Sequence, residues 1–178
     1  QCRGKPDRYW VQHHCGIYKS VDNAKSWQEV KAKPSSFGFG VVVQAYGRRA
    51  GAVIDWLYAL SVRLDRKIMV RLVKGAYWDA EVKRAQVLGL TSFPVFTRKQ
   101  ATDVSYIANA RKLLAMTDRI YPQFATHNAH TVAAILDMAP DKNAYEFQRL
   151  HGMGERLHDI VHTDGATASA TGSSAVAT

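Results

Sequence analysis

The sequence predicts an α/β fold built on a parallel β-sheet, of the kind found in (β/α)-barrels. From about residue 41 onward, β-branched runs alternate with helical patterns of about 10 to 15 residues, which is typical of βαβ units. The strand runs are almost continuously apolar, as in sheets covered on both faces. Polar side chains follow the strands, at the place where a barrel builds its active site.

The first strand is VVVQAY (41–46), and a helical pattern follows it over about 50–64. KIMVRLV (67–73) is the second strand, and the next helix ends at Gly89, a residue type that commonly terminates helices. The apolar face of the 50–64 helix is expected to carry Val53, Leu57, Leu60 and Leu64.

VFTRK (95–99) is short and predicts an extended segment. A helix should follow, with Thr102 or Asp103 as its N-cap, because short polar side chains accept hydrogen bonds from the first turn. Its apolar residues recur at helical spacing: Ile107, Ala110, Leu113 and Leu114.

Two further strand–helix pairs complete this part of the chain. YPQFATH (121–127) is a strand, and Asn128 is placed to cap the helix after it. YEFQRLHG (145–152) is another strand, followed by a short helix to about Val161.

The two ends differ in character from the middle, which predicts three regions: a β-hairpin segment (1–38), the α/β part (39–162) and a disordered tail (163–178). The tail, TDGATASATGSSAVAT, has almost no large apolar side chain to bury. The front segment has no helical period, and its aromatic residues are spaced as in short antiparallel strands with a tight turn: Trp10, Tyr18 and Trp27.

Composition excludes several classes of protein. The net charge is +9, but the 24 Lys and Arg residues form no block of five, so no nucleic-acid partner is expected. No apolar run approaches the roughly 18 to 20 residues that cross a bilayer. No GxGxxG motif follows a strand, which speaks against a dinucleotide-binding Rossmann domain. Two cysteines make no disulfide framework, so a cytoplasmic location is expected.

The stretch VRLVKGAYWDAEVKRAQ (70–86) has the features of a ligand site where a strand becomes a helix. Arg71 is expected to point into the mouth of a barrel. Lys74 and the N–H groups of Gly75 and Ala76 lie where the helix begins, and helix N-termini favour anions. A glycine also lets a ligand approach the backbone closely.

Tyr77 and Trp78 add flat faces on which an aromatic ring can stack. With the cations before them, they suit a large anionic cofactor that contains an aromatic heterocycle. The alternative is an ordinary βα turn, with the aromatics in the core and the cations in solvent.

Other strand ends also carry polar groups. Gln44 could hydrogen-bond a heterocycle, and His151 is followed directly by a glycine. THNAH (126–130) has two histidines, but a metal usually needs further ligands, so no metal site is expected. No Ser or Cys nucleophile motif and no carboxylate pair stands out, which favours chemistry by a bound cofactor.

Several stretches resemble the proline dehydrogenase domain of bacterial bifunctional proline-utilisation flavoenzymes, from about Phe39 to Val161. They are VVVQAYGRRA, MVRLVKGAYWDAEVKRAQ, FPVFTRKQATDVSYIANARKLL, YPQFATHNAH and YEFQRLHGMGE. The resemblance implies a partial (β/α)8 TIM-type barrel, about strands four to seven, that binds FAD. It also implies oxidation of L-proline to 1-pyrroline-5-carboxylate by hydride transfer to flavin, with quinone as the electron acceptor.

The resemblance also implies roles for individual residues. Arg71 and Tyr77 are the implied catalytic residues, and Tyr77 and Leu150 the implied substrate contacts, with no metal involved. The implied cofactor contacts are Gln44, Arg71, Val73, Lys74, Gly75, Ala76, Trp78, Thr97, Arg98, Lys99, Thr126 and His127.

This chain departs from the family pattern, because nothing in it resembles the early strands, the eighth strand or the final helix whose arginines clamp the proline carboxylate. Activity impaired by truncation is therefore expected. The alternative is a non-catalytic remnant, or a chimeric fragment, that binds flavin weakly or not at all. Open barrel edges predict self-association. The resemblance places the chain in the cytoplasm or peripherally at the inner face of the membrane.

The front segment resembles a different family. VQHHCGIYKSVDNAKSWQEV is similar to one Asp-box repeat of sialidase-like β-propeller proteins, with the pattern S-x-D-x-G-x-x-W. Ser20, Asp22 and Trp27 match it, whereas Ala24 stands where the pattern has glycine. One such repeat is a hairpin and cannot bury a propeller core alone.

Overall fold

The chain divides into two compact units, Gln1–Gly38 and Phe39–Thr178. The computed structural model describes residues 9–13, 16–20, 28–29, 40–163, 165–166 and 168–171. No helix in these ranges is both long and apolar enough to cross a membrane.

The first unit contains a three-stranded antiparallel sheet with the order β1-β2-β3. Its strands are β1 (Tyr9–His13), β2 (Gly16–Ser20) and β3 (Gln28–Glu29). His13 pairs with Gly16, so β1 and β2 form the expected hairpin. The Asp-box positions after Ser20 lie outside the described residues.

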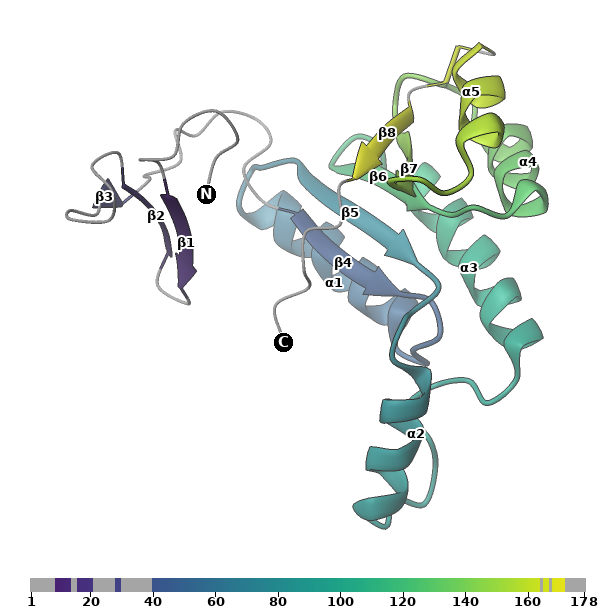
Figure 1. Cartoon of the computed structure of the whole chain (residues 1–178). Coiled ribbons are helices and arrows are strands. Elements are labelled where there is room, and N and C mark those ends of the chain that lie inside the picture. The colour runs from purple at the N-terminus through teal and green to yellow at the C-terminus, as the bar shows by residue number, and fades with distance from the viewer. Residues whose placement is uncertain are drawn as a thin grey trace. The chain divides into compact units, whose positions relative to one another are not determined.

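The second unit is built on a five-stranded parallel sheet with the order β4-β5-β6-β7-β8 (Figure 1). Neighbours in the sheet are also neighbours in sequence, as in a barrel segment, which confirms the predicted fold class. The strands are β4 (Gly40–Gln44), β5 (Ile68–Val73), β6 (Ile120–Ala125), β7 (Glu146–Leu150) and β8 (Ala168–Thr171).

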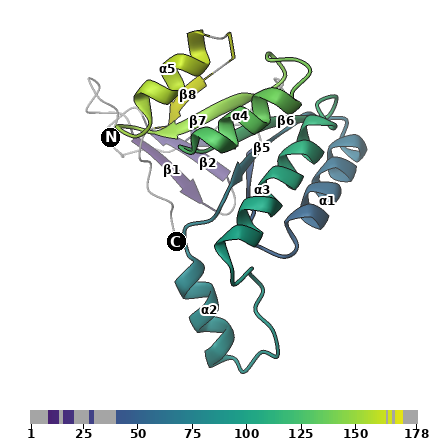
Figure 2. The same cartoon turned by 90° about the vertical axis from the view of Figure 1, so that its right-hand side faces the viewer.

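Helices cover one face of this sheet (Figure 2). They are α1 (Ala50–Arg63), α3 (Lys99–Leu114), α4 (Ala129–Met138) and α5 (Glu155–Thr163). The helix α2 (Trp78–Val87) instead projects beyond the C-terminal ends of β4 and β5, and in it only Ala85 is buried (Figures 1 and 2).

Strict alternation in β5 and β6 builds the core. Every second residue is buried, and these residues are Ile68, Val70, Leu72, Ile120, Pro122 and Phe124. The residues between them, including Arg71 and Gln123, are half-buried on the opposite face. The expectation of strands covered on both faces was therefore wrong, because within the described residues only the helical face is fully covered.

The capping residues in the sequence correctly predicted the start of α4 and the end of α2. Asn128 caps α4, since its Oδ1 accepts a hydrogen bond from the backbone N–H of Thr131 at 3.0 Å. Gly89 follows α2 with φ +62°, and the N–H groups of Gly89 and Leu90 bond back to Gln86 and Ala85. Such paired bonds at a left-handed glycine are a common way to end a helix.

Other local predictions were wrong. The helix α3 begins at Lys99 with Arg98 as N-cap, not at Thr102 or Asp103, and the carboxylate of Asp103 is engaged by lysines instead. The 95–99 segment forms no strand, only a single bridge between Gly47 and Val95. On α1, the buried face is set by Ala50, Ile54, Leu57 and Ser61, so Val53 and Leu64 are exposed.

The strand β8 lies within the 163–178 segment, where the sequence predicted no strand. It pairs in parallel with β7, from Phe147 opposite Ala168 to Leu150 opposite Thr171. A strand at a sheet edge is held by backbone hydrogen bonds, so it does not require the large apolar side chains that this segment lacks.

Candidate functional site

The C-terminal ends of neighbouring strands meet at one edge of the sheet. Gln44 and Val73 are paired in register at the ends of β4 and β5. Ala125, the last residue of β6, pairs with Gln148 near the end of β7. Of the expected contacts, Thr126 follows β6 directly and Leu150 is the last residue of β7, so both lie at this edge.

Backbone hydrogen bonds bring three distant segments together at this edge. Beyond β4, the N–H of Tyr46 donates to the carbonyl of Lys74 at 2.9 Å. The carbonyl of Tyr46 in turn accepts from the N–H of Phe96 at 2.8 Å. Backbone hydrogen bonds therefore hold the residues after β4 next to both the turn after β5 and the segment before α3.

Gly75 has a structural role in the turn, besides the ligand contact that the sequence predicts for it. Its φ is +123°, and an added Cβ would lie 1.6 Å from Cδ1 of Tyr46. The ring of Tyr46 fills the space that a side chain at position 75 would need, so the turn requires glycine for its own packing. Burial raises the pKa of Tyr46, and the Glu81 carboxylate adds to that increase.

Two lysines converge on one carboxylate beside this turn. Nζ of Lys74 lies 2.5 Å from Oδ1 of Asp103, and Nζ of Lys99 lies 3.1 Å from Oδ2. Hydrogen bonds from Lys74 and then Lys99 lower the pKa of Asp103. The lysines come from different segments, so this carboxylate joins the turn after β5 to the start of α3.

The aromatic pair lies near the surface and not in the core. Tyr77 is 48% exposed and Trp78 is 39% exposed. The indole N–H of Trp78 donates to the carbonyl of Phe96 at 2.8 Å. These exposures disfavour the alternative in which both rings pack in the core, and they leave ring surface accessible.

Arg71 lies on the half-buried face of β5, near a buried hydroxyl from α3. Burial raises the pKa of Tyr106, and the positive charge of Arg71 opposes that increase. The hydroxyl of Tyr106 lies 3.2 Å from the carbonyls of both Leu72 and Ala125. Tyr106 therefore ties the ends of β5 and β6 together behind Arg71.

The ends of β6 and β7 are joined through histidine. Nε2 of His127 accepts a hydrogen bond from the N–H of Leu150 at 3.0 Å. The neutral ring must then carry its proton on Nδ1, which becomes a donor. The buried side chain of His158 contacts the carbonyl of Thr126 through Nε2, at 3.1 Å.

Sequence reasoning missed a polar cluster on the half-buried face. Oε1 of Glu146 accepts hydrogen bonds from the side-chain amides of Gln123, at 2.8 Å, and Gln148, at 2.6 Å. Gln123 is paired in register with Arg71, so the cluster adjoins the expected site. Polar residues at alternate positions of β6 and β7 indicate only that they share a face, whereas the contact between Glu146 and Gln123 depends on the register of the two strands.

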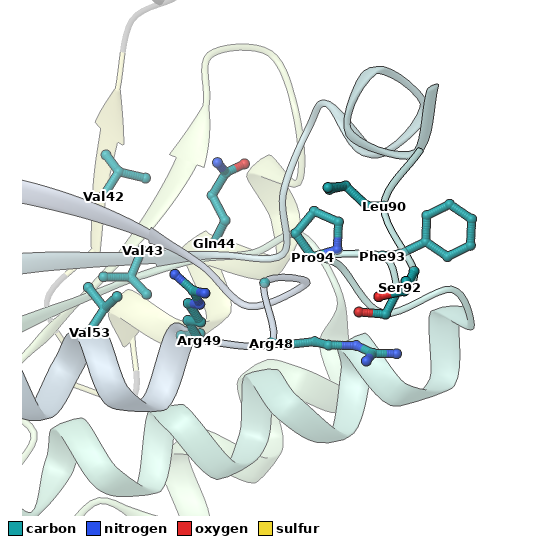
Figure 3. Close-up of a pocket in the computed structure, with 13 residues that line it drawn as sticks. Val42, Val43, Gln44, Arg48, Arg49, Val53, Leu90, Ser92, Phe93 and Pro94 are labelled. Atoms are coloured by element: carbon teal, nitrogen blue, oxygen red, sulfur yellow. The ribbon is translucent and has the colours of Figure 1, made fainter. Parts of the chain in front are cut away.

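A cavity lies beside this site and not in it. It has a volume of about 620 Å³ and is lined by β4, α1 and residues 90–94 (Figure 3). Figure 3 shows Val42 and Gln44 on one side of β4 and Val43 on the other. Of the expected site residues in the described chain, Gln44 alone lines this cavity.

The residues at the strand ends fit a large anionic cofactor with an aromatic ring. Cations are concentrated there, namely Arg71, Lys74, Arg98 and Lys99, and two exposed aromatic rings follow them. Ammonium and guanidinium groups pair with phosphate oxygens, and aromatic faces stack on heterocycles. Within the described ranges no group of three His, Cys, Asp or Glu is placed to hold a metal ion.

Comparison with known proteins gives consistent matches. Residues 9–171 match the family described as proline dehydrogenase. Bifunctional protein PutA from Klebsiella aerogenes and that from Escherichia coli (strain K12) are each 59% identical over 127 residues, which covers 70% of this chain and 10% of the relative. The chain thus spans about a tenth of the length of these curated relatives.

Solved structures agree. A crystal structure of a proline utilization A (PutA) variant from Bradyrhizobium japonicum is 58% identical and superposes with a TM-score of 0.73. The match covers 75% of this chain and 14% of that one.

Proposed function

The chain belongs to the proline dehydrogenase family, and from this premise we propose that it binds FAD and oxidises L-proline to 1-pyrroline-5-carboxylate. The observation that carries the proposal is the convergence of cations and exposed aromatic rings at one end of a parallel sheet. When bound, the flavin would accept a hydride from the proline ring and pass the electrons on to a quinone.

The cofactor contacts are proposed in three groups. Lys74 and Lys99, with Arg98, would pair with the phosphates, because ammonium and guanidinium groups form charge-assisted hydrogen bonds to them. Trp78 would stack on the adenine. Gln44, Thr126 and His127 would contact the flavin, together with Val73, Gly75, Ala76 and Thr97.

Arg71 and Tyr77 are the proposed catalytic residues. Arg71 would place a permanent positive charge beside the flavin ring. A fixed positive charge of this kind stabilises the negative charge that develops on the flavin during hydride transfer. Tyr77 and Leu150 would bound the proline pocket. Both side chains are about half exposed, at 48% and 44%, so they are accessible to a small molecule.

A non-catalytic flavin binder is the second candidate. It is favoured by one observation: in the described residues the face that carries Arg71 is only partly covered, and an uncovered site leaves water around the reacting groups.

The outer edge of β4 has no strand partner among the described residues, and an open edge of this kind favours self-association. A cytoplasmic location, with peripheral contact at the inner face of the membrane, would suit a quinone acceptor.

The test uses the full 178-residue chain, loaded with FAD and freed of excess cofactor. A flavin spectrum that bleaches at about 450 nm when L-proline is added without oxygen supports the enzyme. A stable yellow complex that does not bleach supports the non-catalytic binder instead. A colourless protein overturns both.

Paired variants sharpen this test. Arg71→Met should abolish bleaching, because it removes the proposed charge beside the flavin. Arg66→Met, which changes an exposed arginine before β5, should bleach like the wild type. Equal bleaching of all three proteins would contradict the role of Arg71.

A further inference from the structure

Asp103 is the one residue that contacts two of the proposed phosphate-binding cations in the described chain. We propose that Asp103 is a positioning residue, which holds Lys74 and Lys99 as a preorganised cation pair for the phosphates of the dinucleotide. This inference rests on the proposed function, since it assigns a role to a residue outside the proposed contact set.

The geometry suits this role. The two ammonium groups bind opposite oxygens of one carboxylate, at 2.5 Å from Lys74 and 3.1 Å from Lys99. Each ammonium has three N–H donors. One is used by the carboxylate, so the others stay available for a ligand.

The surrounding backbone fixes both ends of the pair. Lys99 is four residues before Asp103 on α3, a spacing at which side chains are neighbours. Lys74 comes from the turn after β5, which is bonded to Tyr46, and Tyr46 is bonded to Phe96. The indole of Trp78 contacts the carbonyl of Phe96 as well. The backbone at both lysines is therefore held by hydrogen bonds. Asp103 fixes the positions of the two ammonium groups at the ends of their flexible side chains.

Removing the carboxylate has two opposing effects. It raises the local net charge by one, which favours anion binding. It also leaves two neighbouring ammonium groups that repel each other and regain rotamer freedom, which the ligand must then remove again. Lys74 is only 29% exposed at its side chain, so its position depends most on its partner. We expect the loss of preorganisation to dominate.

The experiment measures the dissociation constant of FAD by fluorescence titration of the full chain at fixed ionic strength. Asp103→Asn should weaken FAD binding by about three- to tenfold, the range expected when one or two long side chains must be ordered on binding. Asp55→Asn is the matched control. It removes a carboxylate of α1 that pairs at 2.7 Å with Lys112, a lysine of α3, and it should leave the affinity unchanged.

Riboflavin, which lacks phosphates, separates positioning from general damage. Asp103→Asn should leave riboflavin binding unchanged, whereas equal weakening of both ligands would overturn the proposal. A second test combines Asp103→Asn with Lys74→Met. The effect of Asp103→Asn should shrink below about twofold in that background, because coupled residues are not additive. An undiminished effect would also overturn it.

The outcomes distinguish the two proposals. A wild-type chain that binds no FAD overturns both. Wild-type binding with an unchanged or tighter Asp103→Asn variant overturns the positioning role alone. Thermal unfolding of each variant confirms that it is folded, and Asp103→Glu, which keeps the charge, should recover most of the lost affinity.

Discussion

Nε2 of His127 accepts a hydrogen bond from the backbone N–H of Leu150, with 3.0 Å between the two nitrogens. The bond joins the ends of β6 and β7, and it exists only while Nε2 carries no proton. Burial lowers the pKa of His127 below its ordinary value of 6.5, and the charges of His158 and Arg149 lower it further. The folded state therefore disfavours the protonated ring.

This bond predicts a stability that depends on pH. The folded pKa of His127 lies below the unfolded one, so its contribution is complete above about pH 6.5 and declines as the pH falls toward the folded value. Urea unfolding at about pH 8 and about pH 5.5 measures the difference. His127→Gln should flatten this dependence, whereas His130→Gln, at an exposed histidine, should not. Identical pH slopes for wild type and His127→Gln would refute the prediction.

Gly75→Ala should be strongly destabilising. The new Cβ would overlap the ring of Tyr46, and φ would remain at +123°, which strains any other residue. Together these effects should cost about 2 to 5 kcal/mol of unfolding free energy, measured by denaturant titration.

Gly89→Ala is the control, because its φ is also positive, at +62°, but nothing lies within 4 Å of the added Cβ. It should lose only about 1 to 2 kcal/mol. Equal losses at the two positions would mean that the overlap with Tyr46 contributes nothing.

Glu146→Ala should destabilise the sheet from its half-buried face. It removes the carboxylate oxygen that accepts hydrogen bonds from the side-chain amides of Gln123 and Gln148. Gln148 is only 5% exposed, so water cannot easily replace this acceptor. Buried donors left without a partner predict a loss of about 1 to 3 kcal/mol. Glu155→Ala, which breaks only a surface contact to Arg149 at 3.5 Å, should cost about 0 to 1 kcal/mol. The prediction fails when the two variants unfold at the same urea concentration.

Tyr106→Phe should lower stability by about 1 to 2 kcal/mol, because two strand-end carbonyls lose a buried donor. Tyr58→Phe removes a hydroxyl that contacts Asp118 at the surface, and it should cost about 0.5 kcal/mol or less. Thermal unfolding of both variants measures the difference. A loss confined to Tyr58→Phe would contradict the bridging role of Tyr106.

Much of the fold could be predicted from local signals. The β-branched runs gave the parallel strands, and Asn128 and Gly89 marked helix ends because capping depends on residues adjacent in sequence. The beginning of α3 could not be found this way. Asp103 has the chemistry of an N-cap, but its carboxylate is bound by Lys74, which is 29 residues away.

The site was only partly predictable for the same reason. Residue types at strand ends indicated Arg71, Lys74 and Trp78, because parallel strands bring their ends together. Periodicity could not reveal that Glu146 gathers two amides, since that contact depends on the register between β6 and β7. The assigned roles of the strand-end residues toward FAD remain predictions.

The packing of Tyr46 on Gly75 also constrains how sequences related to this one can vary. The positive φ at position 75 strains any side chain there, and the ring at position 46 adds a steric overlap to that strain. Glycine should therefore persist at position 75 wherever an aromatic ring is kept at 46, and any exception at 75 should be accompanied by a smaller residue at 46. Pairs of substitutions at 46 and 75 across natural homologues would record this constraint without any measurement on the protein itself.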